Sequence, residues 1–185
     1  VWDVWILDLE RGTRSRVTFD QSVKREPAWS SDGMMLAFSV SKVGGAGAFG
    51  VIHAKAANGS GADQVLAADT DSVLQGLHGL HYPQYSPNGR FLAYLRRENS
   101  RGVGIDVKPL EGNGTPFVGV NAAGPRASLA DFRISPNGRW IAYQSDESGR
   151  NEVYVSPFPH GEGKWQVSTG GGDFPTWRGD SRELF

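Results

Sequence analysis

A repeated turn motif, short alternating apolar runs and an absence of helical periodicity predict an all-β fold, a β-propeller of four-stranded antiparallel blades. The motif occurs four times, at residues 27–33, 83–89, 132–138 and 175–181. It reads Pro-x-aromatic-Ser-Pro-Asn-Gly or a variant of that pattern, and the last copy is degraded. Its spacing is close to the roughly 40 to 50 residues of a propeller blade. The chain therefore holds about four blade equivalents, which are three full blades and two half blades.

The residues of the motif are those that a tight hairpin requires. Proline fixes φ at the second position of a type I turn, Asp or Asn suits the third, and Gly accepts the left-handed fourth position. Each copy is followed by an alternating apolar run, a polar Gly-rich loop, a third run and a fourth short run. Period-2 runs bounded by Gly, Pro, Asn and Asp are typical of β-strands joined by hairpins.

We expect a single β-propeller domain or a propeller fragment, with about 16 strands. The predicted parts are a half blade at 1–19, blades at about 26–68, 82–118 and 131–168, and a half blade at 174–185. The first half blade resembles third and fourth strands, and the last resembles first and second strands. Two such halves can close a ring within one chain, or between two chains as an eight-bladed homodimer. A chain that starts without methionine and has a half blade at each end also fits a slice of a longer ring.

Composition excludes several classes of function. The 185 residues include no cysteine, which excludes a disulfide scaffold and thiolate chemistry. The formal net charge of -1 gives no electrostatic reason to expect a nucleic acid. No apolar run is long enough to span a bilayer, so we expect no membrane insertion.

The repeat resembles the WD-like repeat of TolB-type bacterial β-propellers, and the resemblance covers essentially the whole chain. Residues 135–155 are also similar to propellers appended to bacterial serine/threonine kinases. Related propellers accompany prolyl-oligopeptidase-like peptidases. The resemblance implies a protein-binding platform, a gating domain or a sensor-like appendage, in a periplasmic or otherwise extracytoplasmic location. Ser31, Phe132 and Arg178 depart from the pattern of the family.

Candidate binding residues are expected on the face that carries the long loops. These loops are predicted at 41–50, 69–81, 99–104 and 121–130, whereas the hairpins of the other face are tight. Extra loop length gathered on one face is where binding function tends to be placed. The candidates near the channel mouth on this face are Arg25, Glu26, His78, His81, Tyr82, Arg126, Asp131, Arg133 and Asp173.

The leading functional hypothesis is a non-catalytic module that binds a protein or peptide and needs no cofactor. The sequence has no Gly-x-Ser-x-Gly nucleophile elbow, no His-Glu-x-x-His and no P-loop. One alternative is a metal-dependent propeller lyase or hydrolase in which His78 and His81 share a divalent metal. Another is a regulatory or gating fragment of a larger kinase or peptidase.

Overall fold

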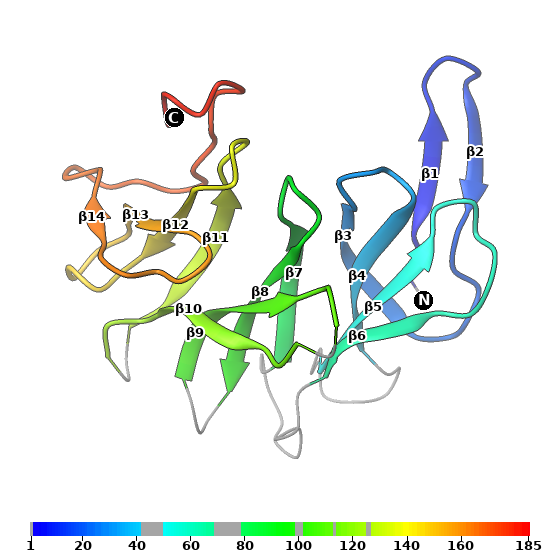
Figure 1. Ribbon diagram of the computed structural model, residues 1–185, viewed down its shortest axis with the longest axis horizontal. Helices are drawn as coiled ribbons and strands as arrows, with labels where there is room; N and C mark the ends of the chain where they lie inside the picture. Colours follow the sequence, from blue (N-terminus) through cyan, green and yellow to red (C-terminus); the bar gives the residue numbers. More distant parts are fainter. Residues whose placement is uncertain (1, 42–49, 69–78, 99–101, 113, 125–126) are drawn as a thin grey trace. The chain divides into compact units, whose positions relative to one another are not determined.

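The computed structural model describes residues 2–41, 50–68, 79–98, 102–112, 114–124 and 127–185. Within these residues it contains fourteen strands, arranged as three four-stranded sheets and one two-stranded hairpin (Figure 1). In this part of the chain no helix is long and apolar enough to cross a membrane. The chain divides into two compact units, unit 1 (Val1–Pro83) and unit 2 (Gln84–Phe185). Each is described by itself.

Unit 1 holds an N-terminal hairpin and a first blade. Its strands are β1 (Trp5–Asp8), β2 (Thr13–Arg16), β3 (Val23–Trp29), β4 (Met35–Ser41), β5 (Val51–Ala56) and β6 (Gln64–Ala68). Blade 1 has the antiparallel order β3-β4-β5-β6. Val4 and Val17 of the hairpin segment form a buried cluster with Leu36 and Phe38 of β4. The hairpin is thereby fixed on one face of blade 1.

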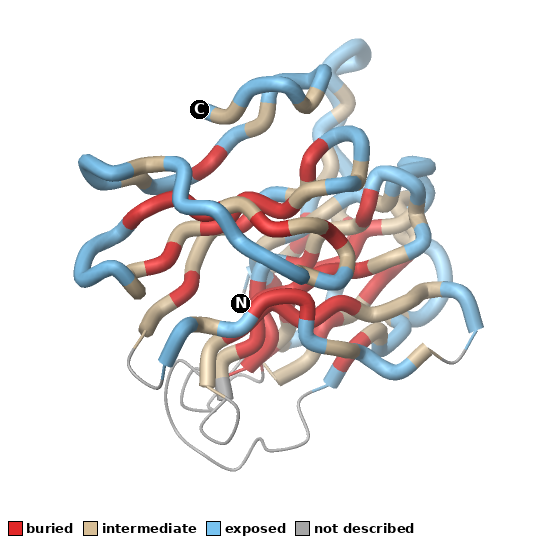
Figure 2. Tube along the Cα trace, turned by 60° about the vertical axis from the view of Figure 1, so that its left-hand side comes forward, coloured by how far each residue is buried: buried red, intermediate tan, exposed pale blue. Residues whose placement is uncertain are grey.

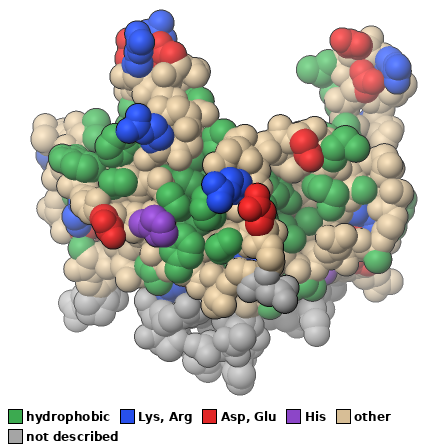
Figure 3. All heavy atoms as spheres, in the orientation of Figure 1, with side chains coloured by type: hydrophobic (Ala, Val, Ile, Leu, Met, Phe, Trp, Pro, Cys, Tyr) green, Lys and Arg blue, Asp and Glu red, His purple; other side chains and the backbone are tan. Residues whose placement is uncertain are grey.

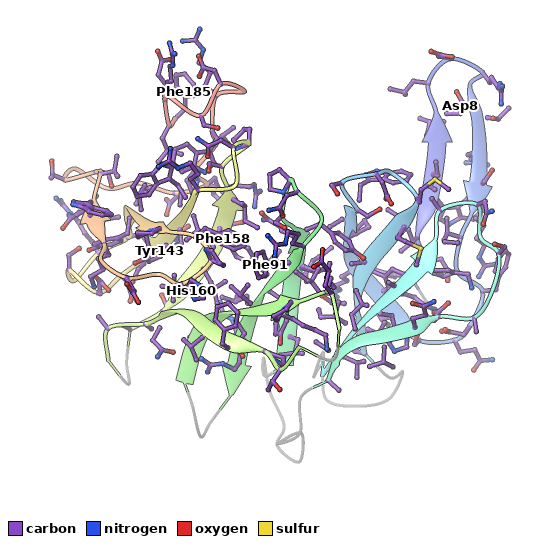
Figure 4. The ribbon with its side chains drawn as sticks, in the orientation of Figure 1. Asp8, Phe91, Tyr143, Phe158, His160 and Phe185 are labelled. Atoms are coloured by element: carbon purple, nitrogen blue, oxygen red, sulfur yellow. The ribbon has the colours of Figure 1, made fainter. Side chains whose placement is uncertain are left out.

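Unit 2 holds two blades that share a core, while β7 (Gly79–Tyr85) spans the junction between the units. The other strands are β8 (Phe91–Glu98), β9 (Gly102–Pro109), β10 (Phe117–Asn121), β11 (Leu129–Ile134), β12 (Trp140–Ser145), β13 (Glu152–Pro157) and β14 (Trp165–Gln166). Blade 2 has the order β7-β8-β9-β10, and blade 3 has the order β11-β12-β13-β14. The rings of Phe91 and Phe158 meet edge to face, with 5.9 Å between centroids, where the two blades pack (Figure 4). Buried residues concentrate in the strands, and exposed residues in the turns (Figure 2).

The serine of the motif explains why the turn recurs. In blade 3, the Ser135 hydroxyl donates to Oδ1 of Asn137 at 2.7 Å and accepts from the Trp140 amide at 3.0 Å. Ser30 and Ser86 make the same pair of bonds in blades 1 and 2. The hydroxyl therefore ties the turn to the start of the next strand, and it satisfies polar groups that would otherwise be costly to bury.

The fourth copy keeps the turn but lacks this hydroxyl, because Arg178 stands where the other copies have serine. The turn still closes, with the Ser181 amide donating to the Arg178 carbonyl at 2.9 Å and Ser181 at φ 61°. The two strands predicted here are reduced to one antiparallel bridge between Trp177 and Leu184. This accounts for the fourteen strands found against the larger number predicted.

The N-terminal hairpin reproduces the outer half of a blade in its hydrogen bonds. The Val4 amide donates to Oγ1 of Thr18, and the Val17 amide donates to the Val4 carbonyl. In blade 3 the Val153 amide likewise donates to Oγ of Ser168, and the Val167 amide to the Val153 carbonyl. The hairpin strands are thus equivalent to β13 and β14. The predicted fold class, an all-β propeller with about four blade equivalents, is confirmed.

Candidate binding site

One non-glycine residue beside each copy of the turn motif lies in the left-handed region, and three of the four belong to the first strand of a blade. These residues are Glu26, Tyr82, Asp131 and Phe174, with φ of 56°, 50°, 32° and 52°. Each stands directly before the first residue of the turn motif. The pairing register shifts at this point between Arg25 and Ala28 and between Ala130 and Phe132, which marks a β-bulge. Such bulges re-aim side chains and are over-represented beside functional sites.

In unit 1 the Glu26 carboxylate brings together three of the predicted residues. Its Oε2 accepts hydrogen bonds from the Tyr82 amide and the Ser39 hydroxyl, both at 2.8 Å. Its Oε1 lies 3.7 Å from Nδ1 of His81. We refer to Glu26, Ser39, His81 and Tyr82 as the Glu26 cluster, which joins β3 and β4 to β7.

The cluster favours the ionised form of Glu26. Burial alone would raise the pKa of this carboxyl, but the His81 imidazole, the Tyr82 amide and the Ser39 hydroxyl together lower its pKa below the usual 4.5. His81 is buried, while the Tyr82 ring is partly exposed. Beside the cluster the exposed Arg25 places its guanidinium 4.4 Å from the centre of the Trp2 ring, a cation–π contact. A half-buried carboxylate therefore lies beside an exposed guanidinium and an exposed phenol.

This arrangement predicts how pH affects stability in a Glu26→Gln variant. A carboxyl whose pKa is lowered by folding stabilises the fold above its unfolded pKa, and that stabilisation is lost as pH falls through the folded pKa. The wild type should therefore exceed the variant in free energy of unfolding near neutrality, and the difference should shrink below about pH 4.5. Urea unfolding of both proteins between pH 6 and pH 3 checks this. A difference that is constant with pH would contradict the role given to the carboxylate.

In unit 2 the predicted residues are placed on separate strands and turns. Asp131 is half-buried, and Arg133 and Asp173 are exposed. Nε1 of Trp177 donates to the Arg133 carbonyl at 3.0 Å, which holds this part of β11. Among the described residues no hydrogen bond or ion pair joins Asp131, Arg133 and Asp173 to one another. They lie in neighbouring repeats without forming a cluster.

Part of the prediction falls outside the described residues. His78 and Arg126 lie there, as do residues 42–49, 69–78, 99–101 and 125–126 of the predicted long loops. The described residues contain no group of three or more His, Asp or Glu residues that could hold a metal ion. Metal binding by His78 and His81 is therefore untested and stays a prediction.

Sequence reasoning missed several residues that shape these sites. Ser39 lies in an apolar run and Trp2 near the start of the chain, so neither stands out as polar or repeated. Gln84 donates from Nε2 to the Phe132 carbonyl and accepts at Oε1 from the Ile134 amide at 3.3 Å, which ties β7 to β11. The signal for Phe174 was present, since it precedes the motif as Glu26 and Tyr82 do.

The sheets, the repeated turn and the half blades define a β-propeller protein. No protein-family model matches the chain, and no curated protein matches it in sequence. Among solved structures, TolB from Acinetobacter baumannii is similar, with a TM-score of 0.71 and 20% identity over 97% of this chain and 41% of that chain. An oligogalacturonate lyase in complex with manganese has a TM-score of 0.69 and 14% identity, over 97% of this chain and 51% of that chain.

A puromycin-hydrolyzing peptidase of Mycobacterium tuberculosis has a TM-score of 0.65 and 19% identity, over 96% of this chain and 30% of that chain. These neighbours confirm the TolB-type and peptidase-type propeller likeness predicted from the repeat. At these identities they show the fold alone. The chain spans about half, or less, of the length of these three structures.

Proposed function

We propose that this propeller module is a non-catalytic binding module for a protein or peptide. The observation that carries the proposal is the left-handed residue directly before every copy of the turn motif. Backbone strain at a repeated position costs stability and persists where the surrounding structure imposes it, often at binding sites. The four positions hold Glu, Tyr, Asp and Phe, two acids and two aromatic residues, so no single chemistry is common to all four. The geometry is kept while the side chain varies, as a recognition surface requires.

In unit 1 the parts have separate roles in this proposal. Tyr82 and Arg25 are the exposed groups, and Tyr and Arg are the residue types enriched at the energetic centres of protein interfaces. Glu26 is a positioning residue, because both donors to its Oε2 come from within the chain. A polar peptide would therefore meet a phenol and a guanidinium on a preorganised backbone, which lowers the entropy cost of binding.

Three pools of synthetic hexapeptides, one acidic, one basic and one uncharged, provide the test. We expect at least one pool to shift the backbone amide resonances of residues 25, 26, 81 and 82, with no peptide cleaved in a parallel mass-spectrometry assay. Arg25→Ala should weaken the interaction roughly fivefold or more. Arg11→Ala, an exposed arginine at the hairpin turn, is the matched control and should leave it unchanged. Shifts from none of the pools, equal effects of the two variants, or cleavage of the peptide would each reject the proposal.

A further inference from the structure

Unit 2 carries an open groove lined largely by indole rings. The groove has a volume of about 290 Å³ and is lined by Trp140, Val155, Trp165, Val167, Trp177 and Ser181. We call it the tryptophan groove. Trp165 is 55% exposed and Val167 is 52% exposed. Figure 3 shows hydrophobic side chains at the surface in the region of β12–β14. An apolar surface of this kind marks an interaction site more often than free protein surface.

Blade 2 shows what covers this face of a blade. Trp140 is the first residue of β12 and pairs with Pro157. Phe91 is the first residue of β8 and pairs with Pro109 in the same way. Trp165 pairs with Val155, as Phe117 pairs with Val107. In blade 2, Val107 belongs to the core that is shared with blade 3, and Phe91 and Phe117 pack against that core. The tryptophan groove is therefore one half of a blade-to-blade interface.

The other half of that interface comes from the third strand of the following blade. Tyr154 and Phe158, in and just after β13, are buried in the same core at 3% and 9% exposure. By the hydrogen-bond equivalence of the hairpin with β13–β14, their counterparts are Trp5 and Leu9. Trp5, Leu7 and Leu9 form what we call the hairpin face. Trp5 is 54% exposed, and Leu9 is 87% exposed.

We propose that two copies of this chain associate head to tail, with the hairpin face of each copy covering the tryptophan groove of the other. In this dimer the hairpin face would cover the tryptophan groove in the same way that the equivalent face of blade 3 covers the equivalent face of blade 2. A second copy is favoured as the occupant because this chain itself carries, in the hairpin face, the counterpart of the residues that cover the equivalent face of blade 2.

Light scattering on the 185-residue chain, from about 1 to 100 µM, tests the association. We expect the mass of two 20.0 kDa chains at the upper concentrations. Leu9→Glu and Trp165→Glu should each weaken the dimer at least tenfold, because a charge enters an apolar contact. Trp29→Glu, at another exposed tryptophan, is the matched control and should not weaken it. A monomer at every concentration, including one whose two surfaces meet within a single chain, would overturn the proposal.

Mixing the two variants tests the head-to-tail arrangement. A Leu9→Glu chain keeps its groove and a Trp165→Glu chain keeps its hairpin face, so their mixed dimer retains one intact junction. We expect the mixture to form dimers at concentrations where each variant alone is monomeric. This outcome also shows that both variants are folded. If both variants stay monomeric when mixed, the pairing of these two surfaces is wrong.

The equivalence also predicts one unfavourable contact. In the third copy of the motif the Ser135 amide donates to the Trp140 carbonyl. In the fourth copy the Arg178 amide donates to the Glu183 carbonyl in the same way, so Glu183 is the counterpart of Trp140. Asp8 is the counterpart of Pro157, the residue that pairs with Trp140. The assembly thus places Asp8 of one copy opposite Glu183 of the other, and like charges directly opposite are destabilising. Asp8→Asn should tighten the dimer about two- to fivefold. An unchanged or weaker dimer would contradict this register.

Discussion

Replacing Arg96 with methionine should destabilise unit 2 by about 3 to 5 kcal/mol. The Arg96 side chain is completely buried, with Nε 3.0 Å from Oδ1 of Asp106. It also donates to the Gly102 carbonyl at 2.9 Å and to Oδ1 of Asn121 at 3.1 Å. The variant removes the Arg96 guanidinium from the buried Asp106 carboxylate, and the loss of this ion pair accounts for the expected effect. Urea unfolding at neutral pH measures it.

Two further variants separate the lost ion pair from other effects. Arg90→Met removes an exposed pair with Glu111 at 3.9 Å and should cost less than about 1 kcal/mol. The double variant Arg96→Met with Asp106→Leu removes both charges and should recover much of the stability lost in the single variant. If the double variant is no more stable than Arg96→Met, packing around the side chain dominates instead. Gly104 lies opposite Arg96, and a Cβ there would come within 2.5 Å of its guanidinium, so the strand leaves this space for the arginine.

Gly161→Ala should destabilise unit 2 by about 3 to 5 kcal/mol, for a steric reason. Gly161 has a φ of 64°, and a Cβ placed there would lie 1.6 Å from the Gly119 carbonyl oxygen. That oxygen belongs to the backbone of β10, so it cannot move away as a flexible side chain could. Thermal or urea unfolding of the variant gives the magnitude.

Gly112→Ala is the control that isolates the clash from backbone strain. Gly112 has nearly the same φ, 68°, but no described atom lies within 4 Å of the added Cβ. This variant should lose only the roughly 1 to 2 kcal/mol that a non-glycine residue costs in the left-handed region. Similar losses in the two variants would show that the β10 backbone yields, contrary to the prediction.

The fold was predictable because its signal is local and repeated. In the first three copies of the motif, the serine, the Asp or Asn and the glycine hydrogen-bond within a few residues of one another, so the sequence alone reveals the turn. The alternating runs that follow then define the strands. Arg178 in place of serine indicated that the fourth copy would be shortened, since this residue lacks the hydroxyl that binds the start of the next strand.

The candidate site was predictable only in part, because its contacts join residues that are distant in sequence. Glu26 and Tyr82 could be placed at equivalent positions of neighbouring repeats, with His81 next to Tyr82, which predicts proximity. The hydrogen bond from Ser39 depends on the bulge that turns Glu26 toward β4, and no sequence pattern marks that bulge. The cation–π contact of Arg25 likewise depends on Trp2, which lies outside any repeat copy.

The left-handed residues have a consequence for how such a protein can evolve. The turn motif and the register set the backbone at these positions, while the side chains there are an acid, a phenol, a second acid and a phenyl ring. The residues that set the backbone are therefore different from the residues whose side chains vary at the surface. Under the proposed function, a substitution at an exposed one of these sites, such as Tyr82, would change what the surface recognises while the turn motif still sets the backbone, so new partners could be acquired without a new architecture.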